Sequence, residues 1–347
     1  MVLEVYKQMI ARKILFTMLS AILLILSIII GVSIGAVRIP PNIVLKILLG
    51  NSLSESNSLY TIIIWKVRLP RVLMASMVGA SLAIAGCLVQ GVFRNPLASP
   101  YVLGISSGAA FGAALAVILE IWLIIPIPIF AFIFAMLSLM ITYVVAAEDG
   151  RLPVTSLLLA GIAVASLFSA LTSFMMYVAG EKLEVIVFWL MGNLTGIRWQ
   201  EVRIVAIGSL PLIALSLFFG QELNVMMLGE DTAKSMGVEV DKSRKIIVIL
   251  VALLVSVCVS YVGPIGFVGL VIPHMVRLVI GPDNRFLIPA SAFFGGAFLV
   301  LADLISRVVI KPAEIPIGII TSLFGVPFFI YLLKRRKRVI THAAESM

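Results

Sequence analysis

The sequence is poor in charge. Only 12% of its 347 residues are Asp, Glu, Lys or Arg, against roughly 25% in an ordinary soluble domain. Histidine and cysteine are also scarce, with two of each. Cys87 and Cys258 each lie inside an apolar run, which speaks against a disulfide framework. These shortages disfavour a soluble domain and a catalytic centre built from several histidines.

Long uncharged runs take the place of the missing charge. They cover residues 14–37, 72–93, 95–119 and 121–147, and each is long enough to cross a bilayer as a helix. A soluble domain could not bury so much apolar surface. The sequence therefore predicts an all-α, polytopic integral membrane protein, and its net charge of +9 indicates cytoplasmic loops rather than binding to nucleic acid.

Ten transmembrane helices in one compact domain over residues 1–347 fit the runs best. The predicted crossings are 14–36, 71–93, 98–119, 122–146, 153–179, 202–220, 245–262, 266–280, 286–309 and 315–333. The uncharged segment 185–197 is too short to span, so it is predicted to be a half-helix at the outer surface or gating a cavity. The segment 263–266 (Gly-Pro-Ile-Gly) interrupts another run, which predicts a turn inside the bundle.

The basic tail sets the predicted orientation. An even number of crossings places both termini on one side, and Lys334–Arg338 is the densest basic cluster. Because basic residues are retained in the cytoplasm, that side is predicted to be cytoplasmic. We expect a multi-pass protein of the cell membrane, surrounded by lipid.

The loop 221–244 is predicted to lie on the cytoplasmic side and to contain one short helix. Glu230 and Asp231 suit the first turn of that helix, and Gly237 suits its left-handed end. Asp241 can cap the next membrane helix. Apolar residues also occur in this loop, namely Leu228, Ala233 and Met236. Such a helix either lies on lipid or fills a groove of a partner protein, and the residues alone leave both open.

Arginines occur at the predicted outer side, where orientation rules disfavour them. Arg68 and Arg71 precede one crossing, and Arg307 lies near the outer end of another. Asp303 is one helical turn before Arg307 and can pair with it. The arginines either reach the lipid headgroups or form a landing site for an acidic partner.

A proline-rich connection follows the second predicted crossing. In the stretch 94–100 (Arg-Asn-Pro-Leu-Ala-Ser-Pro) two prolines fix the path of the chain and prevent a helix. The connection is either a plain turn or a rigid constriction at the inner mouth of a pore.

These stretches resemble the FecCD-type permeases of bacterial and archaeal ABC importers, which carry iron-siderophores, haem, cobalamin or, in some members, oxyanions. The similarity runs in the family's order from residue 60 to 335. The matching segments are 68–71, 79–83, 90–100, 103–104, 157–161, 189–192, 228–237, 266–270, 273–274, 302–303 with Arg307, and 314–325. The cobalamin-importer permease fold is the fold that this resemblance implies.

The resemblance also implies roles for residues at matching positions. Arg68, Arg71 and Arg307 match arginines that receive acidic side chains of an extracytoplasmic substrate-binding protein. Asn95 and Leu97 match a loop that helps to close the cytoplasmic gate, and the segment 185–197 matches a small outer gate helix. The loop helix matches the element that docks into an ATPase subunit, with Leu228, Gly229, Glu230, Ala233, Met236 and Gly237 as its residues.

The implied assembly is a dimer of two permease chains, expected to be a homodimer, with two ATP-binding subunits and a binding protein. The sequence lacks a G-x-x-x-x-G-K-[ST] loop, so ATP must be bound by a partner and this chain is not expected to be an enzyme. No cofactor or metal site is expected. An oxyanion importer of the same family is the alternative, and an ion-driven secondary transporter is a weaker one because the crossings hold few ionisable groups.

Overall fold

The computed structural model describes residues 2–35, 37–49, 58–310 and 312–345, and within these ranges the chain forms helices and no sheet. The helices are α1 (Val2–Ser33), α2 (Pro41–Leu48), α3 (Ser58–Ile62), α4 (Leu69–Val92), α5 (Ile105–Ile118), α6 (Ile127–Ala146), α7 (Val154–Val178), α8 (Leu183–Leu190), α9 (Trp199–Phe218), α10 (Gly220–Met226), α11 (Glu230–Ser235), α12 (Val240–Val262), α13 (Val268–Ile280), α14 (Asn284–Val308) and α15 (Ile317–Glu345). A π-helical turn, Ile63–Arg68, joins α3 to α4.

The ten predicted crossings are confirmed as apolar helices. Seven helices of the described chain are long and apolar enough to cross a membrane, and α5, α13 and residues 317–331 of α15 are shorter apolar helices. Several predicted starts were wrong, most of all those of α1 and α5. α1 already begins at Val2 rather than at 14. The crossing predicted from 98 begins only at Ile105, because Pro100 opens a short 3-10 turn and Gly104 has a φ of 79°.

The loop 221–244 holds more helix than the sequence indicated. It contains α10 as well as the predicted short helix, which is α11. α12 begins at Val240, so Asp241 lies inside its first turn, and the residue at the N-cap is Glu239. The predicted capping role of Asp241 is therefore wrong. The predicted left-handed stop at Gly237 is confirmed by its φ of 85°.

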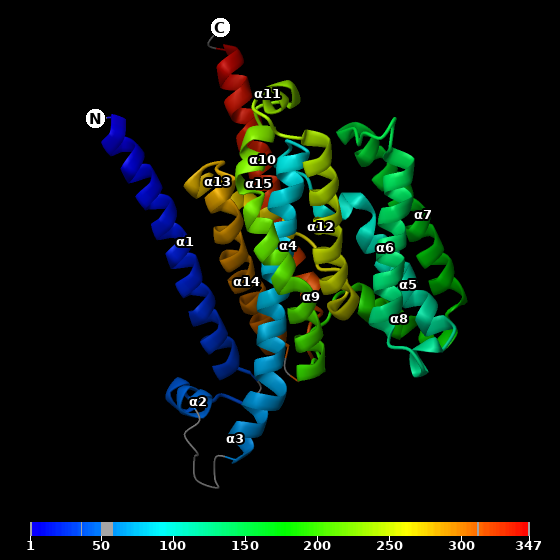
Figure 1. Ribbon diagram of the computed structural model, residues 1–347. Helices are drawn as coiled ribbons and strands as arrows, with labels where there is room; N and C mark the ends of the chain where they lie inside the picture. Colours follow the sequence, from blue (N-terminus) through cyan, green and yellow to red (C-terminus); the bar gives the residue numbers. More distant parts are fainter. Residues whose placement is uncertain (1, 36, 50–57, 311, 346–347) are drawn as a thin grey trace.

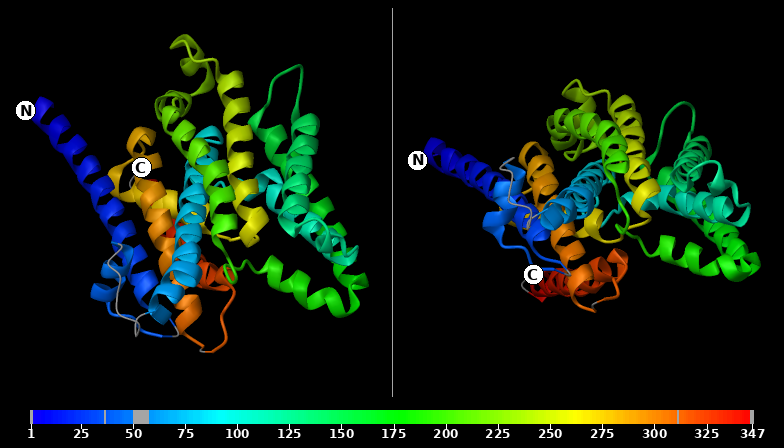
Figure 2. Two further views of the ribbon diagram at one scale, coloured as in Figure 1. Left: turned by 60° about the horizontal axis from the view of Figure 1, so that its bottom comes forward. Right: turned by 90° about the horizontal axis from the view of Figure 1, so that it is seen from below.

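α4 is the central helix of the bundle. It packs against α9, α12, α13 and α14, while α5, α6 and α7 form a second group that packs against α12 (Figures 1 and 2). Glycine allows the closest of these approaches, since a Cβ at Gly86 would lie 1.8 Å from the carbonyl oxygen of Gly269. α4 thus contacts α13 backbone to backbone, as small residues permit in membrane bundles.

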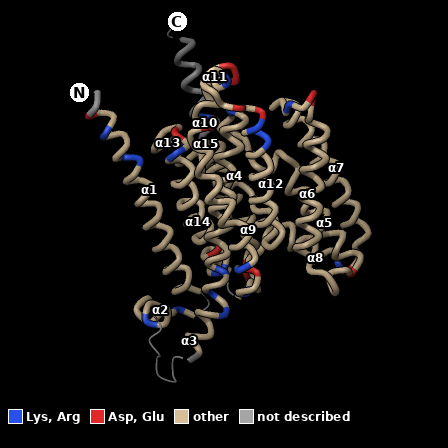
Figure 3. The backbone as a smooth tube through the Cα atoms, in the orientation of Figure 1, with Lys and Arg blue, Asp and Glu red and all other residues tan. Residues whose placement is uncertain are grey.

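Charged residues lie mainly toward the two ends of the bundle, and its middle consists mostly of uncharged residues (Figure 3). At one end, named here the α11 end, lie α10, α11, the start of α1 and the end of α15 (Figure 1). At the opposite end, the α2 end, lie α2, α3 and the last turn of α14. This separation is the one expected for helices that span a bilayer with their polar groups at its two surfaces.

Candidate functional sites at the two ends of the bundle

Four charged residues form a cluster at the α2 end, named here the Arg71 cluster: Arg71, Asp303, Arg307 and Glu314. Arg71 Nε lies 2.8 Å from Asp303 Oδ1, and its Nη1 lies 2.8 Å from Glu314 Oε2. Asp303 Oδ2 lies 3.0 Å from Arg307 Nε, which confirms the pairing predicted from their spacing. Asp303 is fully buried, and Arg71 and Arg307 expose only 7% and 8% of their surface.

The local sequence explains how this cluster forms. Arg71 lies in the first turn of α4, directly after Pro70, which a helix tolerates in its first turn. Asp303 and Arg307 lie four residues apart in the last turns of α14 and therefore share one face. Because α4 and α14 pack against each other, the three side chains meet.

Two arginines at this end also satisfy the last carbonyl groups of α1. Arg68 donates to the carbonyl oxygens of Val32 and Ser33, at 2.8 and 2.9 Å, and to that of Val37. Arg307 Nη2 donates to the carbonyl oxygen of Gly31 at 3.1 Å. A helix leaves its last carbonyls without internal partners and carries a partial negative charge there. Arg68 and Arg307 thus hold the end of α1 against α4 and α14.

Glu314 is the accessible member of the Arg71 cluster. It lies in the connection between α14 and α15, and its side chain is 37% exposed. Its Oε2 also accepts a hydrogen bond of 2.6 Å from Thr195, in the segment between α8 and α9. Partial burial opposes ionisation, but the hydrogen bonds from Thr195 and Arg71 hold the pKa of Glu314 below its ordinary value. The carboxylate is therefore charged at neutral pH.

The segment after α8 is joined to the start of α15 by the backbone as well. The amide of Ile317 donates to the carbonyl of Gly192, and that of Gly318 to the carbonyl of Met191, both at 3.1 Å. α8 itself, predicted as part of 185–197, spans only Leu183–Leu190 and is too short to cross a membrane. It lies where a cleft opens between these segments.

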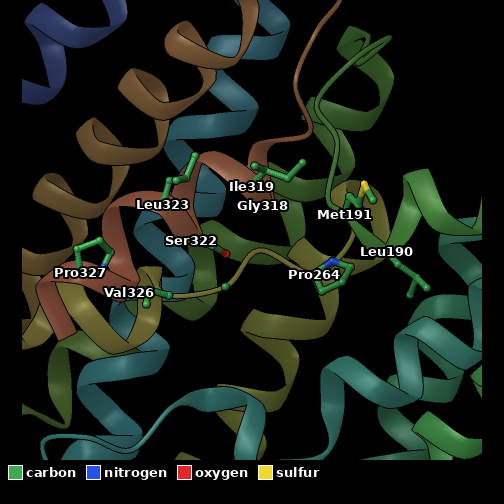
Figure 4. Close-up of a pocket in the computed structure, with 10 residues that line it drawn as sticks. Leu190, Met191, Pro264, Gly318, Ile319, Ser322, Leu323, Val326 and Pro327 are labelled. Atoms are coloured by element: carbon green, nitrogen blue, oxygen red, sulfur yellow. The ribbon is translucent and has the colours of Figure 1, made fainter. Parts of the chain in front are cut away.

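That cleft, of about 670 Å³, is lined mainly by apolar side chains (Figure 4). Its walls come from the end of α8, the turn between α12 and α13, and the first half of α15. The lining residues are Leu190, Met191, Pro264, Gly266, Gly318, Ile319, Ser322, Leu323, Val326 and Pro327. Such a surface can pass a bulky solute without binding it through specific polar groups.

At the α11 end, apolar side chains are exposed beside a buried one. Ala233 of α11 is fully buried, while Leu228 and Met236, which flank the helix, are 65% and 59% exposed. Gly229 permits the turn between α10 and α11, with a φ of 120°. Exposed apolar side chains among charges at this end form a surface that a partner protein could cover.

Ion pairs fix the orientation of α11. Glu230 pairs closely with Arg244 of α12, whose side chain is only 3% exposed. Arg244 also donates to the carbonyl oxygen of Leu152 at 2.8 Å. Arg94, after α4, approaches the same Glu230 at 3.9 Å. Through these contacts α11 is attached to α12 and lies near the predicted gate loop.

The gate loop itself is held by a local hydrogen bond. Asn95 Oδ1 accepts from the amide of Leu97 at 3.0 Å, and both side chains are at least partly accessible. This bond stabilises the turn that Pro96 and Pro100 impose. The role of Asn95 and Leu97 in closing a gate stays a prediction.

A polar network behind α10 was missed by the sequence reasoning. Asn224 of α10 donates to Asp283 at 2.7 Å and accepts from the amide of Asn284 at 2.7 Å. Lys13 of α1 lies 3.1 Å from Asp283. Hydrogen bonding by Arg285 is the main reason that the pKa of Asp283 lies well below its ordinary value. The Gly-Pro-Asp turn at 281–283 was the available signal, since such turns often present an Asp for capping.

Within the described residues, no group of three or more His, Cys, Asp or Glu could hold a metal ion. Cys87 and Cys258 are both buried as free thiols. The Arg71 cluster, the exposed edge of α11 and the apolar cleft are therefore the features on which a function can be built.

Comparison with known proteins agrees with these features. The FecCD transport family matches residues 23–335. The cobalamin import system permease protein BtuC of Halobacterium salinarum is 44% identical over 280 residues, 80% of this chain and 74% of the relative. The Fe(3+)-citrate import system permease protein YfmE of Bacillus subtilis is 38% identical over 94% of this chain and 97% of its own. The hemin transport system permease protein HmuU of Yersinia pestis is 36% identical over 79% of this chain and 84% of its own.

A solved structure has the same fold. It is an inward-facing metal-chelate type ABC transporter, with a TM-score of 0.81 and 32% identity over 92% of this chain and 98% of that one. The helical bundle and these relatives define an ABC transporter permease. The chain belongs to the FecCD transport family, which confirms the resemblance found in the sequence.

Proposed function

We propose that this chain is the membrane-spanning permease subunit of an ATP-driven importer for a metal chelate, which is a ferric siderophore, haem or cobalamin. The carrying observation is the family match over residues 23–335 together with the exposed apolar edge of α11. Relatives named for cobalamin, ferric citrate and haemin import support the cargo class. They do not favour the oxyanion alternative.

The proposed mechanism assigns one task to each end of the bundle. The α11 end faces the cytoplasm, where Leu228, Met236 and the charged residues of α11 contact an ATP-binding subunit. The α2 end receives the extracytoplasmic binding protein at Arg68, Arg71 and Arg307. Motion of the ATPase then moves α10 and α11, and with them α12 through the Glu230–Arg244 ion pair.

The proposed pathway lies between two copies of the chain. The apolar cleft beside α8 and α15 forms one wall, and exposed Leu323 and Phe324 continue that surface along α15. Apolar walls fit a bulky chelate whose selection is made by the binding protein. Two permease chains, two ATP-binding subunits and one binding protein would complete the importer, with both termini of each chain in the cytoplasm.

Affinity purification from the native membrane tests this proposal. We expect a protein with a Walker ATP-binding motif to be recovered in a one-to-one ratio with this chain, and vesicles holding the complex to take up chelate only with ATP. A chain that purifies alone and moves solute on a proton or sodium gradient without ATP would overturn the proposal in favour of a secondary transporter.

A further inference from the structure

The three arginines proposed for docking already have acceptors within this chain. The Arg71 cluster contains two guanidinium groups and two carboxylates, and Arg71 contacts both acids at 2.8 Å. Arg68 is 5% exposed and has three backbone carbonyls as acceptors. Asp303 and Glu314 occupy Nε and Nη1 of Arg71, so an incoming carboxylate that takes either position has to displace an internal acid.

Glu314 is the acid that can move. Asp303 is fully buried on α14 between Arg71 and Arg307, so its removal would leave buried Arg307 without its ion-pair partner and Arg71 with Glu314 alone. Glu314 lies outside the helices and exposes 37% of its side chain. When a carboxylate from a partner replaces Glu314, Arg71 keeps two acidic partners throughout, so the exchange avoids the cost of an unpaired buried charge.

Movement of Glu314 would reach the segment that follows α8. The same Oε2 atom that contacts Arg71 at 2.8 Å accepts the 2.6 Å hydrogen bond from Thr195. Three residues before Thr195, the carbonyl oxygen of Gly192 accepts a hydrogen bond from the amide of Ile317 at the start of α15. Glu314 is thus the side chain that connects Arg71 on α4 with the segment between α8 and α9.

We propose that Glu314 is an internal occupant of Arg71, which a carboxylate of the docking protein displaces, and that its displacement releases Thr195 and the segment after α8. Glu314 is a positioning residue in this scheme. The inference rests on the proposed function, since it requires an acidic protein that docks at the α2 end. It adds that two carboxylates compete for Arg71. In the free permease Glu314 occupies Arg71, and the docking protein binds there by replacing Glu314 with a carboxylate of its own.

The test measures docking of the purified binding protein of the same transport system to the full complex in lipid nanodiscs. Glu314→Gln removes the competing charge, so we expect docking at least about five-fold tighter, the lower range of coupling between linked sites. Glu314→Asp keeps the charge and should restore the affinity to near that of the unsubstituted complex. Glu181→Gln, at an exposed glutamate of the same end, is the matched control and should change nothing.

The direction of the change separates the competing explanations. A purely structural role for Glu314 would make Glu314→Gln dock more weakly, and unchanged or weaker docking overturns the inference. If Glu314→Gln does not fold, Thr195→Val releases Glu314 without removing its charge. It should still tighten docking at least about two-fold, which corresponds to the lower end of the net strength of one hydrogen bond; no tightening overturns the inference. Absence of docking by the unsubstituted complex overturns the proposed docking function and the inference with it, whereas docking that Glu314→Gln leaves unchanged overturns the inference alone.

Discussion

The two ends of the bundle hold their charges in opposite ways. At the α2 end the Arg71 cluster is closed, because its arginines and Asp303 are buried and paired with one another. At the α11 end the acids that pair with Arg244 remain a third or more exposed, and apolar Leu228 and Met236 face outward. A partner can cover the α11 end without rearranging it, whereas at the α2 end an acidic partner has to exchange ion pairs.

Breaking the closed end should have the largest effect on stability. Asp303→Asn removes the one counter-ion shared by Arg71 and Arg307 and leaves two buried cations under-compensated. We expect a loss of about 3–5 kcal/mol in the free energy of unfolding, measured as a lower melting temperature in detergent. The control is Asp231→Asn at the exposed start of α11, which should shift stability by no more than about 0.5 kcal/mol. Equal melting of the two variants would contradict the contrast between the ends.

The buried cation at the α11 end should matter less. Arg244→Gln removes the ion pairs to Glu230 and Asp241 and the bond to Leu152, but both carboxylates stay in contact with water. We expect a cost of about 1–3 kcal/mol, the range for loss of hydrogen bonds at a buried group, measured by the same melting experiment.

Lys242→Gln provides the matched control, because Lys242 is 67% exposed and its ion pair is with exposed Glu239. It should melt like the unsubstituted chain. A loss from Arg244→Gln as large as that from Asp303→Asn would show that partner exposure does not distinguish the two ends.

The sequence predicted the features that follow from a pattern along one helix. The uncharged runs predicted the crossings, and the four-residue spacing of Asp303 and Arg307 predicted their pairing. It could not reach contacts between helices, such as Arg71 with Asp303, since nothing in the pattern of α4 shows that α14 lies beside it. For the same reason it left Glu314 without a partner.

Helix ends were missed for a related reason. An uncharged run marks the part of a helix that lies in lipid, not the whole helix. α12 begins at Val240, so it includes Lys242 and Lys245, which lie before the apolar run. α1 likewise begins at Val2, well before the uncharged run that starts at residue 14. The arginines that cap the end of α1 were interpreted as surface groups, because a capping role appears only when the three helices are seen together.

The exposed apolar edge of α11 should matter least for stability and most for assembly. Leu228→Glu with Met236→Glu replaces two side chains that already face outward. We therefore expect the free energy of unfolding of the isolated chain to change by less than about 0.5 kcal/mol, measured by the same melting experiment. Recovery of the ATP-binding subunit in affinity purification should nevertheless fall to background, since two charges would be buried unpaired in the contact.

Leu123→Glu with Ile124→Glu, at two exposed residues between α5 and α6 and away from α11, is the matched control and should retain the ATP-binding subunit. If both variants retain it, the exposed edge of α11 is not the contact surface. If the α11 variant alone loses the ATP-binding subunit while both variants melt like the unsubstituted chain, then the exposed apolar edge of α11 acts in assembly and contributes little to the stability of the fold.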